Sequence, residues 1–203
     1  MEIKFFPISD CGANCYLVKT SCSALVIDPF EADSRVVDFL NGNKDLKRFI
    51  LLTHCHFDHI LGANKLRKLT GAKIAIGEKD AKGLSDPGIS LSGFVGLSQE
   101  PFSADILLSD NEVLSLGDTD IKVLHTPGHT AGSVCYVLED VIFSGDTLFN
   151  RSVGRTDFPT GDFTALKKSL NRLKSLSKDY VIYSGHGEPT TLFSEIQSNP
   201  YMK

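Results

Sequence analysis

One segment of the chain, residues 53–59, constrains its fold and chemistry most strongly. It reads Thr-His-Cys-His-Phe-Asp-His, so three of the six histidines and one carboxylate fall within six positions. An apolar run over residues 49–52 leads into it, and a helix-like stretch over residues 60–69 follows. Imidazole and carboxylate side chains gathered directly after a buried strand are typical of a metal-binding loop. The segment therefore predicts such a loop at the carboxyl end of a buried strand.

The rest of the chain alternates short apolar runs with turn residues and a few helical patterns. Strand-like runs cover residues 2–8, 15–19, 24–27, 46–53, 73–76, 121–125, 134–138, 141–144 and 181–184. Helical spacing predicts helices over residues 31–40, from near Asp58 to Gly71, over 78–84 and over 162–176. Two groups of strands with helices between and after them predict one domain over residues 1–203, with sheet packed on sheet and helices outside.

Three further segments carry specific expectations. Residues 106–108 and 112–114 flank Ser109-Asp110-Asn111, which predicts a β-hairpin. Residues 85–102 are rich in glycine, serine and proline, which predicts a long loop or flap of the kind that is often functional. The helix over residues 162–176 is amphipathic, with an apolar face made of Phe163, Leu166, Leu170 and Leu173. No element is predicted for residues 192–203.

The composition excludes several classes of function. The net charge is −4 and no long basic run occurs, so the electrostatic footprint of a nucleic-acid-binding protein is missing. The apolar runs are strand-sized, which predicts no membrane-spanning segment, and the N-terminus has the pattern of a strand rather than an export signal. The five cysteines are odd in number, and with no export signal they predict free thiols in a reducing cytoplasm.

Four loops that each follow a predicted strand carry potential metal ligands. Together they supply His54, His56, Asp58, His59, His129, Asp146 and His186. Five imidazoles and two carboxylates suit zinc, ferrous iron or manganese better than calcium or magnesium, which prefer oxygen ligands. Seven ligands exceed the needs of one tetrahedral ion and fit two divalent ions, with zinc favoured over iron or manganese. Two such ions would lower the pKa of a bridging water, giving hydroxide near neutral pH, and polarise a substrate carbonyl.

The motif His-x-His-x-Asp-His at residues 54–59, followed at a distance by three more ligands, resembles the metallo-β-lactamase superfamily. The resemblance implies an α/β fold, a four-layer αββα sandwich with the metals at one edge. It implies that one ion is held by His54, His56 and His129. It also implies that the other ion is held by Asp58, His59 and His186, with Asp146 bridging the two.

Further stretches resemble small hydrolases related to glyoxalase II, which cleave thioesters such as hydroxyacylglutathione. These stretches are Gly154-Arg155-Thr156-Asp157-Phe158, the Pro-Gly-His-Thr loop at 127–130 and the ending Asn199-Pro200-Tyr201. Only seventeen residues follow His186, so the C-terminal helical domain that helps to bind glutathione is expected to be absent. Gly187-Glu188 also stands where glyoxalase II carries a glutathione-contacting tyrosine. The resemblance therefore implies thioester chemistry without implying selectivity for glutathione.

Several residues outside the motif have two interpretations. Arg155 is the candidate substrate-binding residue, because its planar guanidinium suits a carboxylate; the alternative is a structural ion pair with Asp157. Three apolar residues of the 85–102 segment either wall an apolar substrate pocket or form a small satellite core. They are Phe94, Leu97 and Phe102.

The leading hypothesis is a cytoplasmic, metal-dependent hydrolase of a small-molecule thioester. In it, a metal-bridging hydroxide attacks the acyl carbonyl, and Asp58 holds a metal and orients that hydroxide. The alternative is a mononuclear iron persulfide dioxygenase, a class that resembles this chain in the same motif and would use His54, His129 and Asp146. Lactonase, β-lactamase and nuclease activities are less favoured. No nucleic-acid or membrane partner is expected, and the choice between monomer and homodimer stays open.

Overall fold

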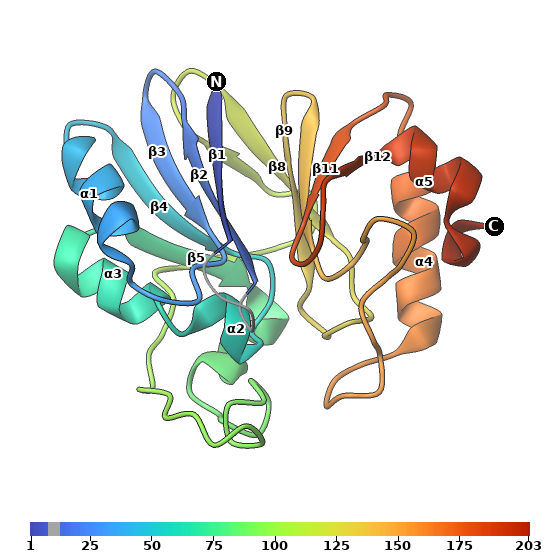
Figure 1. Ribbon diagram of the computed structural model, residues 1–203, viewed down its shortest axis with the longest axis horizontal. Helices are drawn as coiled ribbons and strands as arrows, with labels where there is room; N and C mark the ends of the chain where they lie inside the picture. The colour runs from blue at the N-terminus through green and yellow to red at the C-terminus, as the bar shows by residue number, and fades with distance from the viewer. Residues whose placement is uncertain (8–12) are drawn as a thin grey trace.

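The computed structural model describes residues 1–7 and 13–203, and within them the strands form two six-stranded sheets. The first sheet has the order β1 (Glu2–Pro7), β2 (Asn14–Lys19), β3 (Ser23–Ile27), β4 (Lys47–Leu52), β5 (Lys73–Gly77) and β6 (Ile106–Leu108). The second has the order β12 (Thr190–Thr191), β11 (Val181–Ser184), β10 (Val141–Gly145), β9 (Val134–Leu138), β8 (Asp120–His125) and β7 (Val113–Ser115). The two sheets lie beside each other between helices (Figure 1).

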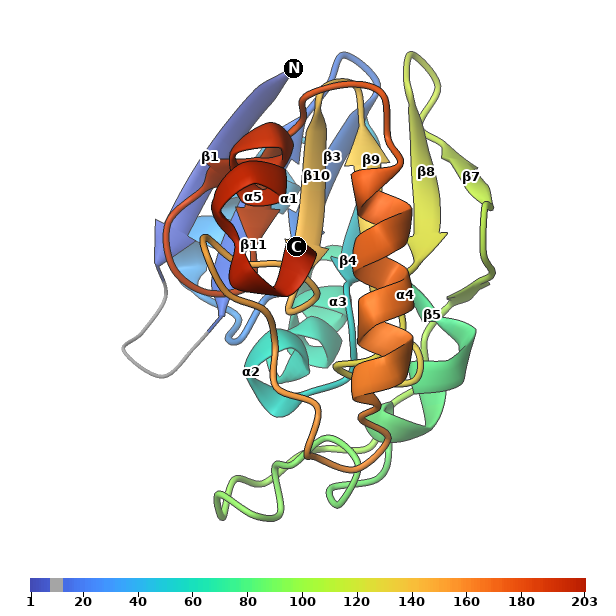
Figure 2. The same ribbon diagram turned by 90° about the vertical axis from the view of Figure 1, so that its right-hand side faces the viewer.

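Helices cover the outer face of each sheet. On the first sheet, α1 (Ser34–Gly42) and α3 (Ala63–Thr70) bury Leu40 and Leu66 in a cluster with strand residues. On the second, α4 (Phe163–Lys174) and α5 (Leu192–Ser198) bury Leu170 and Leu192 in another cluster, and Figure 2 shows both helices in front of that sheet. A third cluster, which includes Tyr136, fills the space between the sheets. The four-layer αββα prediction is confirmed.

Strand β4 is buried on both faces, which explains its continuous apolar sequence. Phe49 and Leu51 join the cluster between the sheets, whereas Ile50 and Leu52 join the cluster under the helices. The strand pairs in parallel with β3 on one side and β5 on the other. The carboxyl ends of these three strands therefore meet at one edge of the sheet, where the 53–59 segment begins.

The helix predicted from near Asp58 to Gly71 is two helices in the structure. A single turn, α2 (Phe57–Ile60), is separated from α3 by Leu61 and Gly62. The amide of Gly62 donates to the carbonyl of Pro29 at 2.9 Å, and a Cβ at this position would collide with the backbone of Glu31. The close approach of that neighbouring loop interrupts the helix. The spacing of apolar residues in the sequence gives no sign of this contact.

The predicted hairpin around Ser109-Asp110-Asn111 is wrong. Strand β6 pairs with β5 in the first sheet, and β7 pairs with β8 in the second, so this segment crosses between the sheets. The Asp110 carboxylate fixes the crossing, because it accepts from the backbone N–H of His125 at 2.9 Å and from Arg172 at 2.6 Å. In the sequence, two short strands joined by turn residues are equally compatible with a hairpin and with a crossing between the sheets.

The remaining expectations need smaller adjustments. The helix predicted over 31–40 begins at Ser34, where the Asp33 side chain caps it, and residues 78–84 form a 3₁₀ helix, η1 (Glu78–Leu84). Residues 85–105 contain turns and loop, as predicted for a flap, while Phe163 is exposed rather than buried on α4. The unassigned ending folds into β12, α5 and a 3₁₀ turn, η2 (Pro200–Met202). Among the helices of the described residues, none combines the length and apolarity needed to cross a membrane.

Candidate metal centre

The seven predicted ligands gather at one edge of the two sheets. They come from the loops after β4, β8, β10 and β11 and from α2, which lies at the lower end of the sheets in Figure 1. Their potential ligand atoms form three overlapping groups, and within each group these atoms lie within 4.8 Å of one another. The groups are His54, His56 and His129; His54, His59 and Asp146; and Asp58, His59 and His186.

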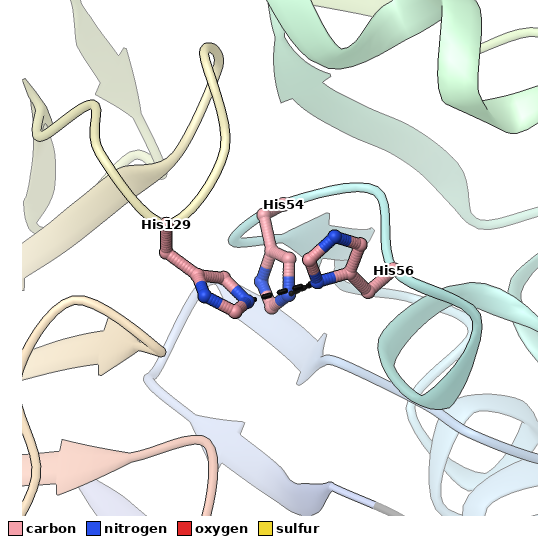
Figure 3. A group of neighbouring side chains, drawn as sticks. All are labelled: His54, His56 and His129. Atoms are coloured by element: carbon pink, nitrogen blue, oxygen red, sulfur yellow. Dashed lines mark hydrogen bonds between the residues drawn. The ribbon is translucent and has the colours of Figure 1, made fainter. Parts of the chain in front are cut away.

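Three buried imidazole rings converge in the first group (Figure 3). Nδ1 of His56 lies 3.1 Å from Nε2 of His54 and 2.8 Å from Nε2 of His129. The outward-facing nitrogens of two rings have partners of their own. Nδ1 of His129 lies 2.7 Å from the carbonyl oxygen of Arg155, and Nδ1 of His54 lies 3.2 Å from Oγ1 of Thr53.

These partners decide where the protons lie. A carbonyl oxygen only accepts, so His129 donates from Nδ1 and keeps a lone pair on Nε2. The Thr53 hydroxyl donates to the Asp28 carboxylate at 2.7 Å, so it accepts from Nδ1 of His54, whose Nε2 also keeps a lone pair. Both lone pairs face Nδ1 of His56, which can donate to only one of them. Three nitrogens directed at one point in this way fit a cation at their centre.

The group made of Asp58, His59 and His186, called the second group from here on, mixes carboxylates with imidazoles. Nε2 of His59 lies 3.7 Å from Oδ2 of Asp58 and 3.4 Å from Oδ1 of Asp146, while Nε2 of His186 lies 3.1 Å from Oδ2 of Asp58. The other nitrogen of His59 donates to Asp28 at 2.9 Å. Within the described residues, Nε2 of His59 and Oδ1 of Asp146 are buried without a hydrogen-bond partner. A proton on His59 would satisfy that nitrogen, whereas a metal ion would satisfy the nitrogen and both carboxylates together.

Asp146 lies between the two groups. Its Oδ1 is 3.4 Å from Nε2 of His59 in the second group, and its Oδ2 is 3.4 Å from Nε2 of His129 in the first. This position suits a carboxylate shared by two ions that lie a few ångström apart. His186, whose side chain is 40% exposed, is the most open member of the second group, so the centre is accessible from its side.

The two groups differ in charge when no metal is bound. Burial lowers the pKa of His56 to about 3, and burial together with neighbouring imidazoles lowers the pKa of His54 well below its ordinary value. Burial also disfavours the charged form of His59, but the carboxylates of Asp58 and Asp28 outweigh it and raise the pKa of His59 well above its ordinary value. His54 and His56 thus present neutral nitrogens, while His59 holds a proton that an ion must displace.

A cavity of about 560 Å³ opens beside both groups. Five of the predicted ligands line it, together with side chains from residues 91–95 and 149–159. Phe94 is part of its wall, as the pocket interpretation predicted. Phe102 packs instead against the core under the first sheet, and Leu97 is exposed outside the cavity lining.

Arg155 lines the cavity, but its guanidinium is engaged. Nε and Nη2 donate to the two carboxylate oxygens of Asp157 at 2.7 and 2.6 Å, which is the ion-pair alternative from the sequence. The guanidinium carbon also lies 4.0 Å from the ring centre of Phe158. The part of Arg155 that touches the ligand groups is its backbone carbonyl, which holds His129.

The family model described as the metallo-beta-lactamase superfamily matches residues 8–186. The chain belongs to this superfamily. Among relatives within it, a Haemophilus influenzae protein named hydroxyacylglutathione hydrolase GloC is 32% identical, over 100% of this chain and 98% of its own. A Bacillus subtilis protein named probable metallo-hydrolase YqgX is 30% identical, over 100% of this chain and 98% of its own.

Solved structures of the metallo-beta-lactamase superfamily agree with the fold. The B3 metallo-beta-lactamase BLEG-1 has a TM-score of 0.86 at 34% identity and covers 99% of both chains. TTHA1623 in a di-iron-bound form has a TM-score of 0.84 at 31% identity, covering 98% of this chain and 99% of its own. ETHE1 from Myxococcus xanthus has a TM-score of 0.76 at 28% identity, covering 98% of this chain and 84% of its own. BLEG-1 and the GloC relative are named for different activities, so the superfamily fold alone leaves the substrate undecided.

Asp28 is a buried carboxylate that the sequence analysis missed, and it supports the candidate metal centre through hydrogen bonds. It accepts from the backbone N–H of Thr53 at 2.8 Å, from the Thr53 hydroxyl at 2.7 Å and from Nδ1 of His59 at 2.9 Å. It thereby orients His59 directly and His54 through Thr53. The sequence feature that could have revealed Asp28 is its position directly after β3. Strands β3 and β4 are parallel neighbours, so their carboxyl ends lie at the same edge of the sheet.

A second missed carboxylate, Asp80 of η1, joins the two loops that carry the first group. Its Oδ2 accepts from the backbone N–H of Cys55 at 2.9 Å and from the hydroxyl of Thr130 at 2.7 Å, and its Oδ1 accepts from the N–H of Gly132 at 2.7 Å. Cys55 lies between His54 and His56, and Thr130 follows His129. Burial raises the pKa of Asp80 despite these hydrogen bonds. Asp80 therefore links the 53–59 segment, which carries His54 and His56, to the 126–132 loop, which carries His129.

Proposed function

We propose that the chain is a metal-dependent hydrolase of a small-molecule acyl thioester. The observation that carries the proposal is the convergence of imidazole lone pairs and carboxylates on two adjacent points at the side of a cavity. The likeness to a protein named hydroxyacylglutathione hydrolase supports a thioester as the bond that is cleaved. Zinc is the proposed metal at both points, with iron or manganese as alternatives, because imidazole and carboxylate ligands suit all three.

The proposed reaction adds water across the thioester, so that a C–O bond forms, the C–S bond breaks and the thiol carries away a proton. Two divalent ions held by the seven ligands would supply a nucleophile at neutral pH and draw charge from the substrate carbonyl. Asp58 lines the cavity, where its carboxylate can accept a hydrogen bond from the attacking water and orient it. A thiol has an ordinary pKa of about 8.5, so its thiolate leaves without a separate general acid.

The proposal is tested by metal analysis of the purified protein and a hydrolysis screen. We expect about two ions per chain and turnover of thioesters such as S-lactoylglutathione in preference to a lactone or a β-lactam. Asp58→Asn should lose the ion of the second group and most of kcat. The matched control is Asp38→Asn on the exposed face of α1, which should behave as the parent protein. Full activity of Asp58→Asn with unchanged metal content would contradict the assignment.

A second candidate function is a mononuclear iron persulfide dioxygenase. It is supported by the proximity of His54, His129 and Asp146 within the cluster. Oxygen uptake with glutathione persulfide, together with about one ferrous ion per chain, would favour this function. Two ions per chain and no oxygen uptake would exclude it.

A further inference from the structure

Within the described residues, the cavity beside the ligand groups is lined mainly by apolar side chains, apart from the potential ligands and Arg155. Its volume of about 560 Å³ lies in the range of small-molecule sites. Beyond the potential ligands, the side chains that form its walls come from residues 91–95, from residues 149–159 and from Phe57 of α2. They are chiefly Leu91, Phe94, Val95, Phe149, Val153 and Phe158. A surface of this kind binds hydrocarbon, because burying it releases water from both partners.

The cavity offers little to a negatively charged group away from the metals. Of its described lining residues, Arg155 is the only lysine or arginine, and Asp157 holds two of its nitrogens while Phe158 covers its face. A substrate carboxylate would have to exchange with Asp157 and would gain only the difference between two exposed ion pairs, which is small. A carrier with two carboxylates, such as glutathione, is therefore poorly matched to these walls.

Two wall residues lie exposed at the tip of the 85–105 segment. Phe94 is 75% exposed and Val95 is 52% exposed. Figures 1 and 2 both show this segment, in green, below the sheets on the side of α2. Neighbouring large apolar side chains left open to water beside a cavity mark a surface that a ligand can cover.

The base of the same segment is fixed to the metal loop. Gln99 is buried, donates to the carbonyl of Gly83 at 2.8 Å and accepts from the hydroxyl of Ser92 at 3.0 Å. The carbonyl of Ser90 accepts from the backbone N–H of Phe57, next to His56, at 2.8 Å. These bonds hold the base of the segment, on both sides of Phe94, next to the loop that carries His56.

We propose that this cavity binds the hydrocarbon chain of an acyl thioester, with the thioester carbonyl at the ligand groups and the chain against Phe94 and Phe158. The substrate class is therefore a medium-chain acyl thioester with an uncharged acyl part. This inference rests on the proposed thioester hydrolysis and narrows its substrate. Water again supplies the oxygen for the new C–O bond while the C–S bond breaks, and no other reactant is needed.

The first test measures kcat/KM for straight-chain thioesters, from acetyl to decanoyl, on one small uncharged thiol. Each methylene that enters the cavity should raise kcat/KM about fourfold, as expected from the burial of one CH₂ group, until the cavity is full. S-lactoylglutathione should be a poorer substrate than the best member of the series. A flat or falling series with S-lactoylglutathione as the best substrate would overturn the inference and leave thioester hydrolysis intact.

The second test uses Phe94→Ser, which removes an exposed ring and should leave folding unaffected. The ratio of kcat/KM for the octanoyl and acetyl thioesters should fall at least about tenfold, since the long chain loses a wall worth several methylenes. The matched control is Phe193→Ser, which removes an exposed ring of α5 outside the cavity lining and should keep the parent ratio. Light scattering is run alongside: an unchanged ratio with a changed molecular mass would assign Phe94 to contact with a second copy of the chain and overturn the inference.

A binding measurement separates failure of this inference from failure of the proposed function. Calorimetric titration of zinc-loaded protein with butanoate, hexanoate, octanoate and decanoate reports on the cavity without any turnover. Affinity that rises with chain length and weakens in Phe94→Ser would support the chain site even if no thioester is cleaved. Affinity independent of chain length would overturn it even if thioesters are cleaved.

Discussion

The backbone carbonyl of Arg155 lies 2.7 Å from Nδ1 of His129 and holds the ring with Nε2 turned toward the other ligands. The guanidinium of the same residue points to Asp157 instead. Gly154 precedes it and passes so close that a Cβ there would lie 2.8 Å from Nδ1 of His129 and collide with the carbonyl of Asp146. The main chain at 154–155, rather than the arginine side chain, therefore supports the centre.

This relationship predicts opposite results for neighbouring substitutions. Gly154→Ala should push the 154–155 backbone away from His129 and weaken zinc binding about tenfold or more, as the loss of a partner behind a ligand does. Arg155→Gln keeps the carbonyl and should leave zinc affinity at the parent value. Competition with a chromogenic chelator measures both. Equal losses in the two variants would show that the arginine side chain also supports the centre.

Replacing Asp28 should mainly weaken metal binding by the second group. The residue has a positive φ of 52°, which asparagine tolerates, so Asp28→Asn should keep the backbone. It removes the charge behind His59 and replaces one of the two acceptor oxygens with an N–H₂ group, which cannot accept. We expect the affinity for the second zinc ion to fall about 10- to 100-fold, with a smaller loss for the first. Stepwise zinc titration of chelator-treated protein measures this, with Asp38→Asn as the exposed control. Parent-like affinity at both steps would contradict the role assigned to Asp28.

The convergence of the seven predicted ligands could be anticipated because each lies in a short motif directly after an apolar run. The same reasoning could have predicted Asp28, since its strand, β3, ends at the same edge of the sheet as β4. It could not have predicted Asp80, because its three partners lie 25 to 52 positions away and no local pattern links them. Sequence motifs report residues that share a loop, whereas hydrogen bonds between loops appear only when the fold is known.

The same limit explains the errors in the fold. Strands and their burial follow from apolar alternation, so both sheets were anticipated. The sheet to which β6 and β7 each belong depends on distant partners such as Arg172, which is 62 positions from Asp110. The break at Gly62 likewise depends on the loop at Glu31. Local patterns predict elements, and long-range contacts decide how they join.

The crossing held by Asp110 predicts a pH-dependent contribution to stability. Partial burial raises the pKa of this carboxyl, but hydrogen bonds from Arg172 and from the N–H of His125 outweigh it and lower the pKa below its usual value. A lowered pKa in the folded state means that the stabilisation is present above the unfolded pKa and is lost as the pH falls through the folded pKa.

Asp110→Asn should therefore lower the free energy of unfolding at pH 7 by up to about 1 kcal/mol, because the ion pair is partly exposed. The difference from the parent should shrink as the pH falls from about 4, the ordinary pKa of an aspartate, through the lower pKa of Asp110 in the folded parent. Urea unfolding at pH 7 and pH 3 measures it. An equal difference at both pH values would mean that the charge of Asp110 is not what stabilises the crossing.

Replacing Asp80 should change the metal centre, although Asp80 touches none of the ligand side chains. Asp80→Asn keeps the size of the side chain but replaces a carboxylate oxygen with an N–H₂ group, which cannot accept from Cys55, Thr130 or Gly132. Leaving a buried donor unpaired costs about 1–3 kcal/mol, so the free energy of unfolding should fall by that amount. Glu78→Gln, an exposed change in the same 3₁₀ helix, is the matched control.

Stability alone would not show that Asp80 positions ligands, so the decisive measurement is spectroscopic. With the loops of His54, His56 and His129 no longer joined, the geometry around a bound ion should change. The visible absorption of the Co²⁺-loaded protein reports that geometry. We expect shifted bands in Asp80→Asn and parent bands in Glu78→Gln. A destabilised Asp80→Asn protein with parent bands and parent zinc affinity would assign Asp80 to the stability of the fold and not to the metal centre.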